Sequence, residues 1–216
     1  MHTEELDQGT QTLVSRAKFA EYSIYAVVPF FVAVMIGEAL EIVGVIDLRA
    51  FELDLLAELY SLVLIGTLPF YIFSVITIAM WIHRAHKNLH DQGVEGLEYT
   101  PGWGVGWYFI PIANLFKPFQ AMKELWGASH RYKGNFGDPA EGNLGLWWGL
   151  WIFGGILSNI STRMSMSDDP GIYDSGIILS FISSGLNLGA AYLIWQIIRQ
   201  ITAAQVSRIS LSEVFE

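Results

Sequence analysis

The sequence contains no cysteine, which excludes disulfide bonds and thiolate chemistry. Charged residues are also scarce: they make up 15% of the 216 residues, whereas about 25% is usual in soluble proteins. Basic residues are the rarer sign, with 12 Lys and Arg against 21 Asp and Glu and a net charge of −9. Because a nucleic-acid-binding protein needs a basic face, nucleic acid is excluded as a partner.

No catalytic constellation is visible either. The sequence shows no nucleophile with an adjacent base, no phosphate-cradling loop and no paired acid and base in a polar setting. Gly102, Gly104 and Gly106 alternate with other residues, but they lack the strand and helix that flank a dinucleotide site. These absences predict a non-enzymatic protein without a cofactor.

Apolar residues are abundant at 52% of the chain, and they gather in four long segments. Because about 20 apolar residues cross a hydrocarbon core of about 30 Å, each segment is long enough to span a membrane. The sequence therefore predicts an all-α polytopic membrane protein, with residues 1–216 forming one membrane domain. The predicted transmembrane helices cover residues 22–46, 59–82, 144–162 and 176–198. The first is longer than the apolar region of a signal peptide, so it is expected to stay as an anchor.

Polar segments flank and connect these spans. Residues 1–21 read as a polar arm, flexible to residue 12 and then weakly helical at the membrane interface. Residues 83–143 form a central loop, and residues 199–216 a polar tail. Of the 12 Lys and Arg, 10 lie in these three segments and only Arg49 and Arg163 lie elsewhere. The positive-inside rule then predicts an inner-membrane protein with both termini and the central loop in the cytoplasm.

The central loop contains an unusual stretch, residues 100–131, which is broken by three prolines and rich in aromatic residues. We interpret it as an interfacial or re-entrant segment, with its second half an amphipathic surface helix. Lysine and arginine in this region, Lys133 included, would attract anionic lipid headgroups at about 1 kcal/mol each. The residues predicted to contact lipid or a protein partner are Trp103, Trp107, Tyr108, Asn114, Lys117, Lys123, Trp126 and Arg131. Two alternatives are that the stretch merely plugs the helix bundle or that it lines a pore.

Two carboxylates, Glu38 and Glu41, lie inside the first predicted span, where a charge costs about 2.5–3.5 kcal/mol. They either reach water at the outer interface or bind a cation or proton, as in an oligomeric ion channel or small transporter. Asn159 and Asn187 offer hydrogen bonds from the third and fourth spans. Small residues that allow close helix packing lie around them, within the chain or in a homo-oligomer. These are Ala33, Gly37 and Gly44 in the first span and the pairs Gly145/Gly149 and Gly185/Gly189.

Four histidines lie in the central loop: His83, His86, His90 and His130. The first three share one helical face and could hold a transition metal. An interfacial, metal-dependent lipid enzyme would need such a site. The simpler interpretation is a set of interfacial histidines, because no Glu-rich companion set accompanies them.

The run Tyr99-Thr-Pro-Gly-Trp-Gly-Val-Gly-Trp-Tyr-Phe-Ile-Pro-Ile-Ala-Asn-Leu-Phe-Lys-Pro-Phe119, preceded by Arg84-Ala-x-x-Asn88-Leu, resembles a bacterial membrane-protein family. That family is catalogued only as domain of unknown function 4328. The matching motif positions are Arg84, Asn88, Pro101, Gly102, Trp103, Pro111, Asn114 and Pro118. The resemblance implies a four-helix membrane domain with this stretch as its signature, and it implies no activity, cofactor or catalytic residue. From the residues we expect the stretch to engage the cytoplasmic leaflet or a protein partner.

Overall fold

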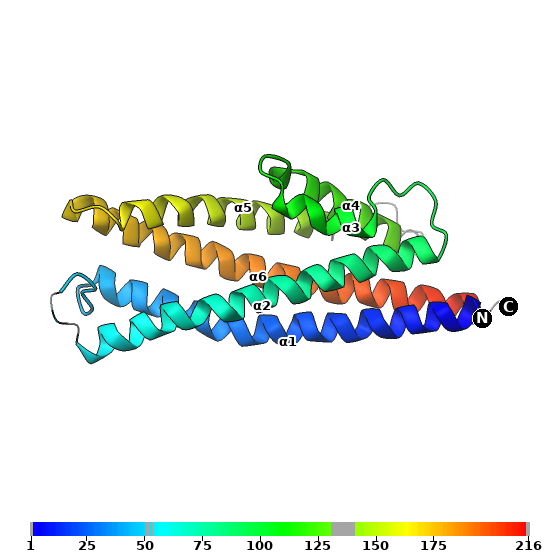
Figure 1. The fold of residues 1–216 in the computed structure, drawn as a ribbon, viewed down its shortest axis with the longest axis horizontal. Helices are drawn as coiled ribbons and strands as arrows, with labels where there is room; N and C mark the ends of the chain where they lie inside the picture. Colours follow the sequence, from blue (N-terminus) through cyan, green and yellow to red (C-terminus); the bar gives the residue numbers. More distant parts are fainter. Residues whose placement is uncertain (1, 51, 53, 131–140, 215–216) are drawn as a thin grey trace. The chain divides into compact units, whose positions relative to one another are not determined.

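The structure, a computed structural model, describes all residues except 1, 51, 53, 131–140 and 215–216, and over these residues it consists of helices and their connecting turns, with no strand. Figure 1 shows the order of the elements along the chain. They are α1 (His2–Ile42), α2 (Leu55–Asp91), α3 (Pro101–Gly106), η1 (Trp107–Phe109), η2 (Ala113–Leu115), α4 (Lys117–His130), α5 (Glu141–Met164) and α6 (Pro170–Val214). The all-α prediction is confirmed.

Four of the described helices, α1, α2, α5 and α6, are long and apolar enough to cross a membrane, as predicted. The segments concerned are Gln8–Ile42, Leu55–Asp91, Asn143–Met164 and Pro170–Ser207. Large apolar side chains such as Leu62 and Ile65 of α2 are exposed, which suits a surface in contact with lipid. The chain is therefore a multi-pass membrane protein.

Three of these helices continue well beyond a single membrane crossing. Helix α1 has 41 residues, α2 has 37 and α6 has 45, whereas about 20 suffice to cross the hydrocarbon. The predicted flexible end at residues 1–12 is wrong, because α1 begins at His2, and the predicted polar tail is helical to Val214. The predicted interfacial face of α1 also differs, since its Leu13 and Ala20 are fully buried within the protein.

The helix ends follow local sequence signals. After α1, Gly44 has φ +74° and donates to the Glu41 carbonyl, while Val45 N donates to Leu40 O at 2.8 Å. This is the Schellman pattern, in which a residue with positive φ follows the helix and glycine is favoured. It ends α1 at Ile42, four residues before the predicted end of the span.

The starts of α2 and α6 are capped by aspartates. Asp54 Oδ1 accepts from Ala57 N at 2.8 Å, and Asp169 Oδ1 accepts from Gly171 N at 2.8 Å. Pro170 then occupies the first position of α6, where a missing N–H costs nothing. The acidic connections therefore set the boundaries of the apolar helices.

The chain forms two compact units, and each of the four long helices contributes to both. The first unit comprises residues 1–23, 74–146 and 193–216, and it contains α3 and α4. The second unit comprises residues 24–73 and 147–192. The first unit has a core of fully buried side chains: Leu13, Trp81, Leu89, Met122, Leu125, Leu144, Ile197, Ile198 and Ile201.

In the second unit, small residues allow close packing, but only partly at the predicted positions. Gly37 lies against the ring of buried Tyr60 from α2. Gly154 receives Asn187, whose Oδ1 would lie 2.9 Å from a Cβ at Gly154, and Ser183 Oγ donates to Gly154 O at 2.9 Å. In the predicted pairs, Gly145, Gly149 and Gly185 face open space, and only Gly189 approaches another helix, at Leu150.

Replacing Gly37 by alanine is expected to lower the stability of the second unit by about 1–3 kcal/mol, the usual cost of overpacking a core. The new Cβ would overlap Cδ2 and Cε2 of the Tyr60 ring, and Tyr60 is buried against Ala57 and Ile46. Thermal unfolding in detergent measures the change. Gly145→Ala is the matched control, because its Cβ meets nothing within 4 Å. Equal melting temperatures for Gly37→Ala and Gly145→Ala would contradict the packing described for Tyr60.

Candidate functional site

The stretch between α2 and α4 exposes a group of large apolar side chains. Phe109 and Ile112 are 74% and 75% exposed, and Trp103 is 50% exposed. We call this group the apolar tip, and its members are Trp103, Phe109, Ile110, Ile112, Leu115 and Phe116. The break in the chain follows from the sequence. Thr100 caps α3 through its side chain, Pro101 opens the helix, and 3-10 turns replace helix around Pro111.

The backbone is strained at the centre of the apolar tip. Ile112 has φ +70° and ψ −56°, and Ala113 N donates to Pro111 O at 2.9 Å across it. This is a γ-turn with positive φ, a rare conformation that a β-branched residue adopts only with strain. Strain of this kind costs about 1–3 kcal/mol and is concentrated at functional positions. The turn places an apolar side chain on the surface at an energetic cost, which marks it as a candidate functional feature.

The base of the apolar tip is aromatic and carries one cation. The rings of Trp103 and Trp107 lie 4.6 Å apart. Lys117 Nζ lies 5.8 Å from the centre of the Trp107 ring and 5.5 Å from that of Tyr99, within the range of cation–π attraction. Tyr99 OH donates to Gln120 Oε1 at 2.8 Å, which ties the base to α4. A lysine therefore lies immediately next to the exposed apolar side chains.

Helix α4 differs from the predicted surface helix. The face that carries Met122, Leu125 and Trp126 is buried in the first unit, and Ser129 of the same face is buried with it. Trp126 stacks on His130, with ring centres 4.2 Å apart. The apolar face of α4 therefore packs against protein, and Trp126 is not available to lipid in this structure.

The remaining predicted contact residues are dispersed. Lys123 is exposed on α4, Tyr108 is half-buried in η1, and Asn114 lies in η2. Trp107 Nε1 and Asn114 Oδ1 are both buried without a partner among the described residues. Arg131 and Lys133 lie outside the described residues.

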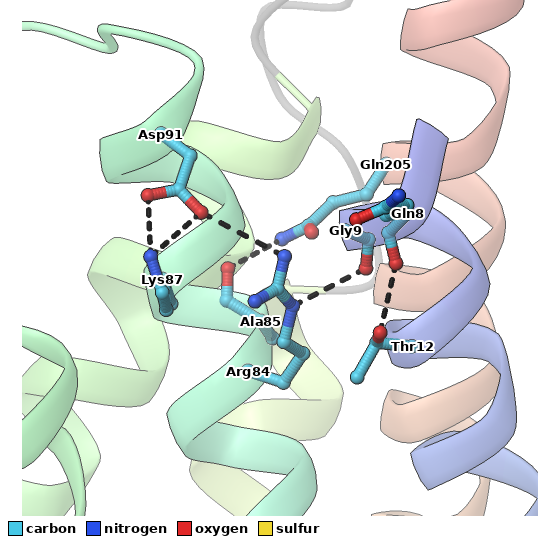
Figure 2. A network of polar contacts seen from close by, with 8 residues as sticks. All are labelled: Gln8, Gly9, Thr12, Arg84, Ala85, Lys87, Asp91 and Gln205. Atoms are coloured by element: carbon cyan, nitrogen blue, oxygen red, sulfur yellow. Dashed lines mark hydrogen bonds and ion pairs between the residues drawn. The ribbon is translucent and has the colours of Figure 1, made fainter. Parts of the chain in front are cut away.

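The motif residue Arg84 on α2 connects two helices of the first unit. Figure 2 shows Arg84 reaching from α2 to α1, where its Nε donates to Gly9 O at 3.2 Å. Arg84 also lies 3.7 Å from Asp91, which accepts two hydrogen bonds from Lys87. A Cβ at Gly9 would overlap the Arg84 guanidinium, so the absence of a side chain at Gly9 lets Arg84 adopt this position. Sequence reasoning missed Gly9, since nothing distinguishes it within a polar segment.

Buried Gln205 of α6 is a second connection that sequence reasoning missed. Its Nε2 donates to Ala85 O of α2 at 3.1 Å and to Ser129 Oγ of α4 at 3.0 Å (Figure 2 shows the first bond). The neighbouring motif residue Asn88 is also buried, and its amide has no partner in the described structure. Gln205 therefore joins α6 to both α2 and α4.

The histidines occupy separate environments. His86 is buried beneath α3, where a Cβ at Gly104 would lie 2.8 Å from His86 Cδ2. His90 Nε2 lies 3.0 Å from Tyr99 O, and His130 Nδ1 lies 2.9 Å from Trp126 O. Among the described residues, no group of three or more His, Cys, Asp or Glu could hold a metal ion. The candidate metal set, His83 included, is not brought together.

The intramembrane carboxylates belong to the second unit. Glu38 is only 3% exposed, so the predicted alternative of reaching water at the interface is wrong for it. It accepts hydrogen bonds from Ser180 and Ser184 of α6, neither of which the sequence singled out. Glu41 is partly exposed and accepts from Tyr173 OH.

The two asparagines do not join these carboxylates. Asn159 Nδ2 donates to Gly155 O within its own helix at 2.9 Å. Asn187 Nδ2 lies 3.3 Å from Ser183 Oγ, beside Gly154.

The fold defines a class: an all-α, multi-pass membrane protein whose second and third long helices are joined through a broken aromatic segment. The chain belongs to the family described as Domain of unknown function (DUF4328), whose model matches residues 46–203, more than half of its length. The expected family resemblance is confirmed. Comparisons with curated proteins and with solved structures found no significant match to either.

Proposed function

We propose that the protein is a non-enzymatic component of the bacterial inner membrane, and that its apolar tip inserts into the cytoplasmic leaflet. The observation that carries this proposal is the strained, 75% exposed Ile112 at the centre of the tip. Strain that turns an apolar side chain away from the protein is compensated when an apolar solvent receives it. A multi-pass protein always has such a solvent beside it.

The magnitudes favour insertion. Complete burial of one large apolar side chain contributes about 1.5–3 kcal/mol, so two or three tip residues outweigh the cost of the γ-turn. Lys117 adds about 1 kcal/mol near an anionic surface, and the tryptophan rings suit headgroup depth.

The neighbouring helices support contact with lipid. Within the first unit, Met80 of α2 and Leu146 of α5 are exposed apolar residues on either side of the segment in the chain. Apolar surface that suits lipid therefore occurs on the long helices that precede and follow this segment. The basic bias of the central segment supports its position on the cytoplasmic side.

The test exploits the absence of native cysteine. Ile112→Cys carries an environment-sensitive fluorophore in full-length protein reconstituted into liposomes with anionic lipid, and Glu95→Cys, in the exposed segment after α2, is the control. We expect the Ile112 probe to emit as in an apolar medium and to be quenched by nitroxide-labelled lipids. The Glu95 probe should respond only to an aqueous quencher.

Two outcomes would overturn the proposal. The Ile112 probe could be as accessible to the aqueous quencher as the Glu95 probe, or it could be shielded from water without quenching by labelled lipid. The second outcome would indicate a protein partner, including a second copy of the chain. Labelling of Glu95→Cys in inside-out but not right-side-out vesicles by an impermeant thiol reagent tests the cytoplasmic orientation independently.

A further inference from the structure

Glu38 is a buried carboxylate that lies against hydroxyl groups of another helix. It lies in α1, one helical turn before the end of the helix, and is 3% exposed. Two hydroxyl groups from α6 reach it: Ser180 Oγ donates to Oε1, and Ser184 Oγ lies 3.1 Å from the same oxygen. Two helices far apart in the sequence thus bring three side-chain oxygen groups to one place in the second unit.

The second carboxylate oxygen of Glu38, Oε2, lacks a partner among the described residues. Glu38 Oε2 is buried and accepts no hydrogen bond from the described residues. No lysine, arginine or histidine of the described chain forms an ion pair with Glu38. A carboxylate removed from water needs a compensating positive charge or a proton.

The groups around Glu38 do not supply that charge. Glu41 lies one turn further along α1, and Tyr60 of α2 lies against the adjacent Gly37. Tyr173 of α6 donates to Glu41, and the cation Arg49 lies over the Tyr173 ring with its Cζ 4.8 Å from the ring centre. The surroundings of Glu38 are therefore acidic or neutral.

We propose that Glu38, Ser180 and Ser184 form a binding site for one monovalent cation, either a proton or Na⁺, within the membrane-spanning helices. A proton would bind to Glu38 Oε2. A sodium ion would be coordinated by the Glu38 carboxylate and by the lone pairs of the two hydroxyl oxygens, which are hard oxygen ligands of the kind that such a cation prefers. Partly exposed Glu41 lies between this site and the end of α1, so it marks the side from which the cation enters.

The site is independent of the apolar tip, and it supplies the binding step that an ion channel or transporter would require. It differs from an ordinary structural carboxylate in one measurable respect. A structural carboxylate paired with a lysine or arginine would be ionised at neutral pH and would bind no exchangeable sodium.

The experiment tests for a bound proton and for bound Na⁺ in the full-length protein, which is reconstituted into lipid nanodiscs at neutral pH. Infrared difference spectroscopy between the parent and Glu38→Gln detects the carbonyl stretch of a protonated carboxyl, and equilibrium binding of radioactive sodium counts bound Na⁺. In sodium-free buffer we expect one protonated carboxyl that Glu38→Gln removes. Alternatively, with NaCl but not choline chloride, we expect one Na⁺ per chain, lost in the same variant.

Glu58→Gln is the matched control, because Glu58 is an exposed carboxylate in the first turn of α2. It should leave both signals unchanged. If Glu38→Gln fails to fold, Ser180→Ala serves instead. It should shift the carbonyl stretch or weaken sodium binding at least tenfold. An ionised Glu38 with no bound sodium would overturn the proposal, as would signals that Ser180→Ala leaves unaltered.

Discussion

Replacing Trp81 by alanine is expected to lower the free energy of unfolding by about 3–5 kcal/mol, the range for a large aromatic residue removed from a core. Trp81 is fully buried in the first unit, and its Nε1 donates to Thr202 Oγ1 at 3.0 Å. The variant would leave a cavity between α2 and its neighbours. It would also leave the partly buried Thr202 hydroxyl without its donor.

The effect of Trp81→Ala is measured by denaturant titration or thermal unfolding in a mild detergent. Trp103→Ala is the control, since Trp103 is half exposed at the apolar tip and should lose little stability. A Trp81→Ala protein that unfolds at the same denaturant concentration as Trp103→Ala would show that the first unit is not packed as described.

Replacing Leu125 by alanine is expected to cost about 2–5 kcal/mol, although the sequence places Leu125 on an apparently ordinary amphipathic surface helix. In the structure Leu125 is fully buried between Met122 and Trp126 on the inner face of α4. Removing its methyl groups would therefore create a cavity within protein.

Leu115→Ala is the matched control for this prediction, because Leu115 is 53% exposed at the apolar tip. It should leave the unfolding transition in detergent nearly unchanged. Thermal unfolding of both variants, followed by circular dichroism, separates the two environments. Comparable losses of stability for Leu115→Ala and Leu125→Ala would mean that α4 and the apolar tip share one environment, contrary to the structure.

The four long helices could be predicted from sequence because a segment that crosses the hydrocarbon core of a membrane must be long, apolar and almost free of charge. A run of about 20 residues with almost no charge has few other stable fates. The residues at which the helices end were harder to predict from the sequence. The predicted first span passes through Gly44 to residue 46, whereas the positive φ of Gly44 ends the helix earlier. An isolated glycine within an apolar run gives only a weak signal for such an ending.

Composition does not reveal which apolar medium covers an amphipathic face. The helical arm before residue 21 and the second half of the stretch 100–131 are predicted to lie at the membrane surface, yet Leu13 and Ala17 of α1 and Leu125 of α4 are buried in protein. The spacing records that a face avoids water, and it is the same for a lipid surface and a protein core. Only the arrangement of the other helices distinguishes the two.

The candidate sites depend on pairings that no local pattern contains. The acidic residue Glu38 could be singled out because carboxylates are costly in a span, but its partners Ser180 and Ser184 lie more than 140 residues away. Serine is common in membrane helices and gives no signal. The γ-turn at Ile112 was likewise unpredictable, because a β-branched residue is among the least suited to positive φ.

The contributions of distant segments to the first unit have a consequence for biosynthesis. Its core includes Leu13 near the start of the chain, Trp81 in the middle and Ile201 near the end. The chain emerges from the ribosome in order, so the earlier helices must enter the bilayer before Ile201 exists. Until α6 is synthesised, Trp81 lacks its Thr202 partner and the Leu13 face of α1 lacks part of its final core. The nascent protein therefore passes through a stage in which the core of the first unit is incomplete and its exposed apolar surface must be protected from aggregation.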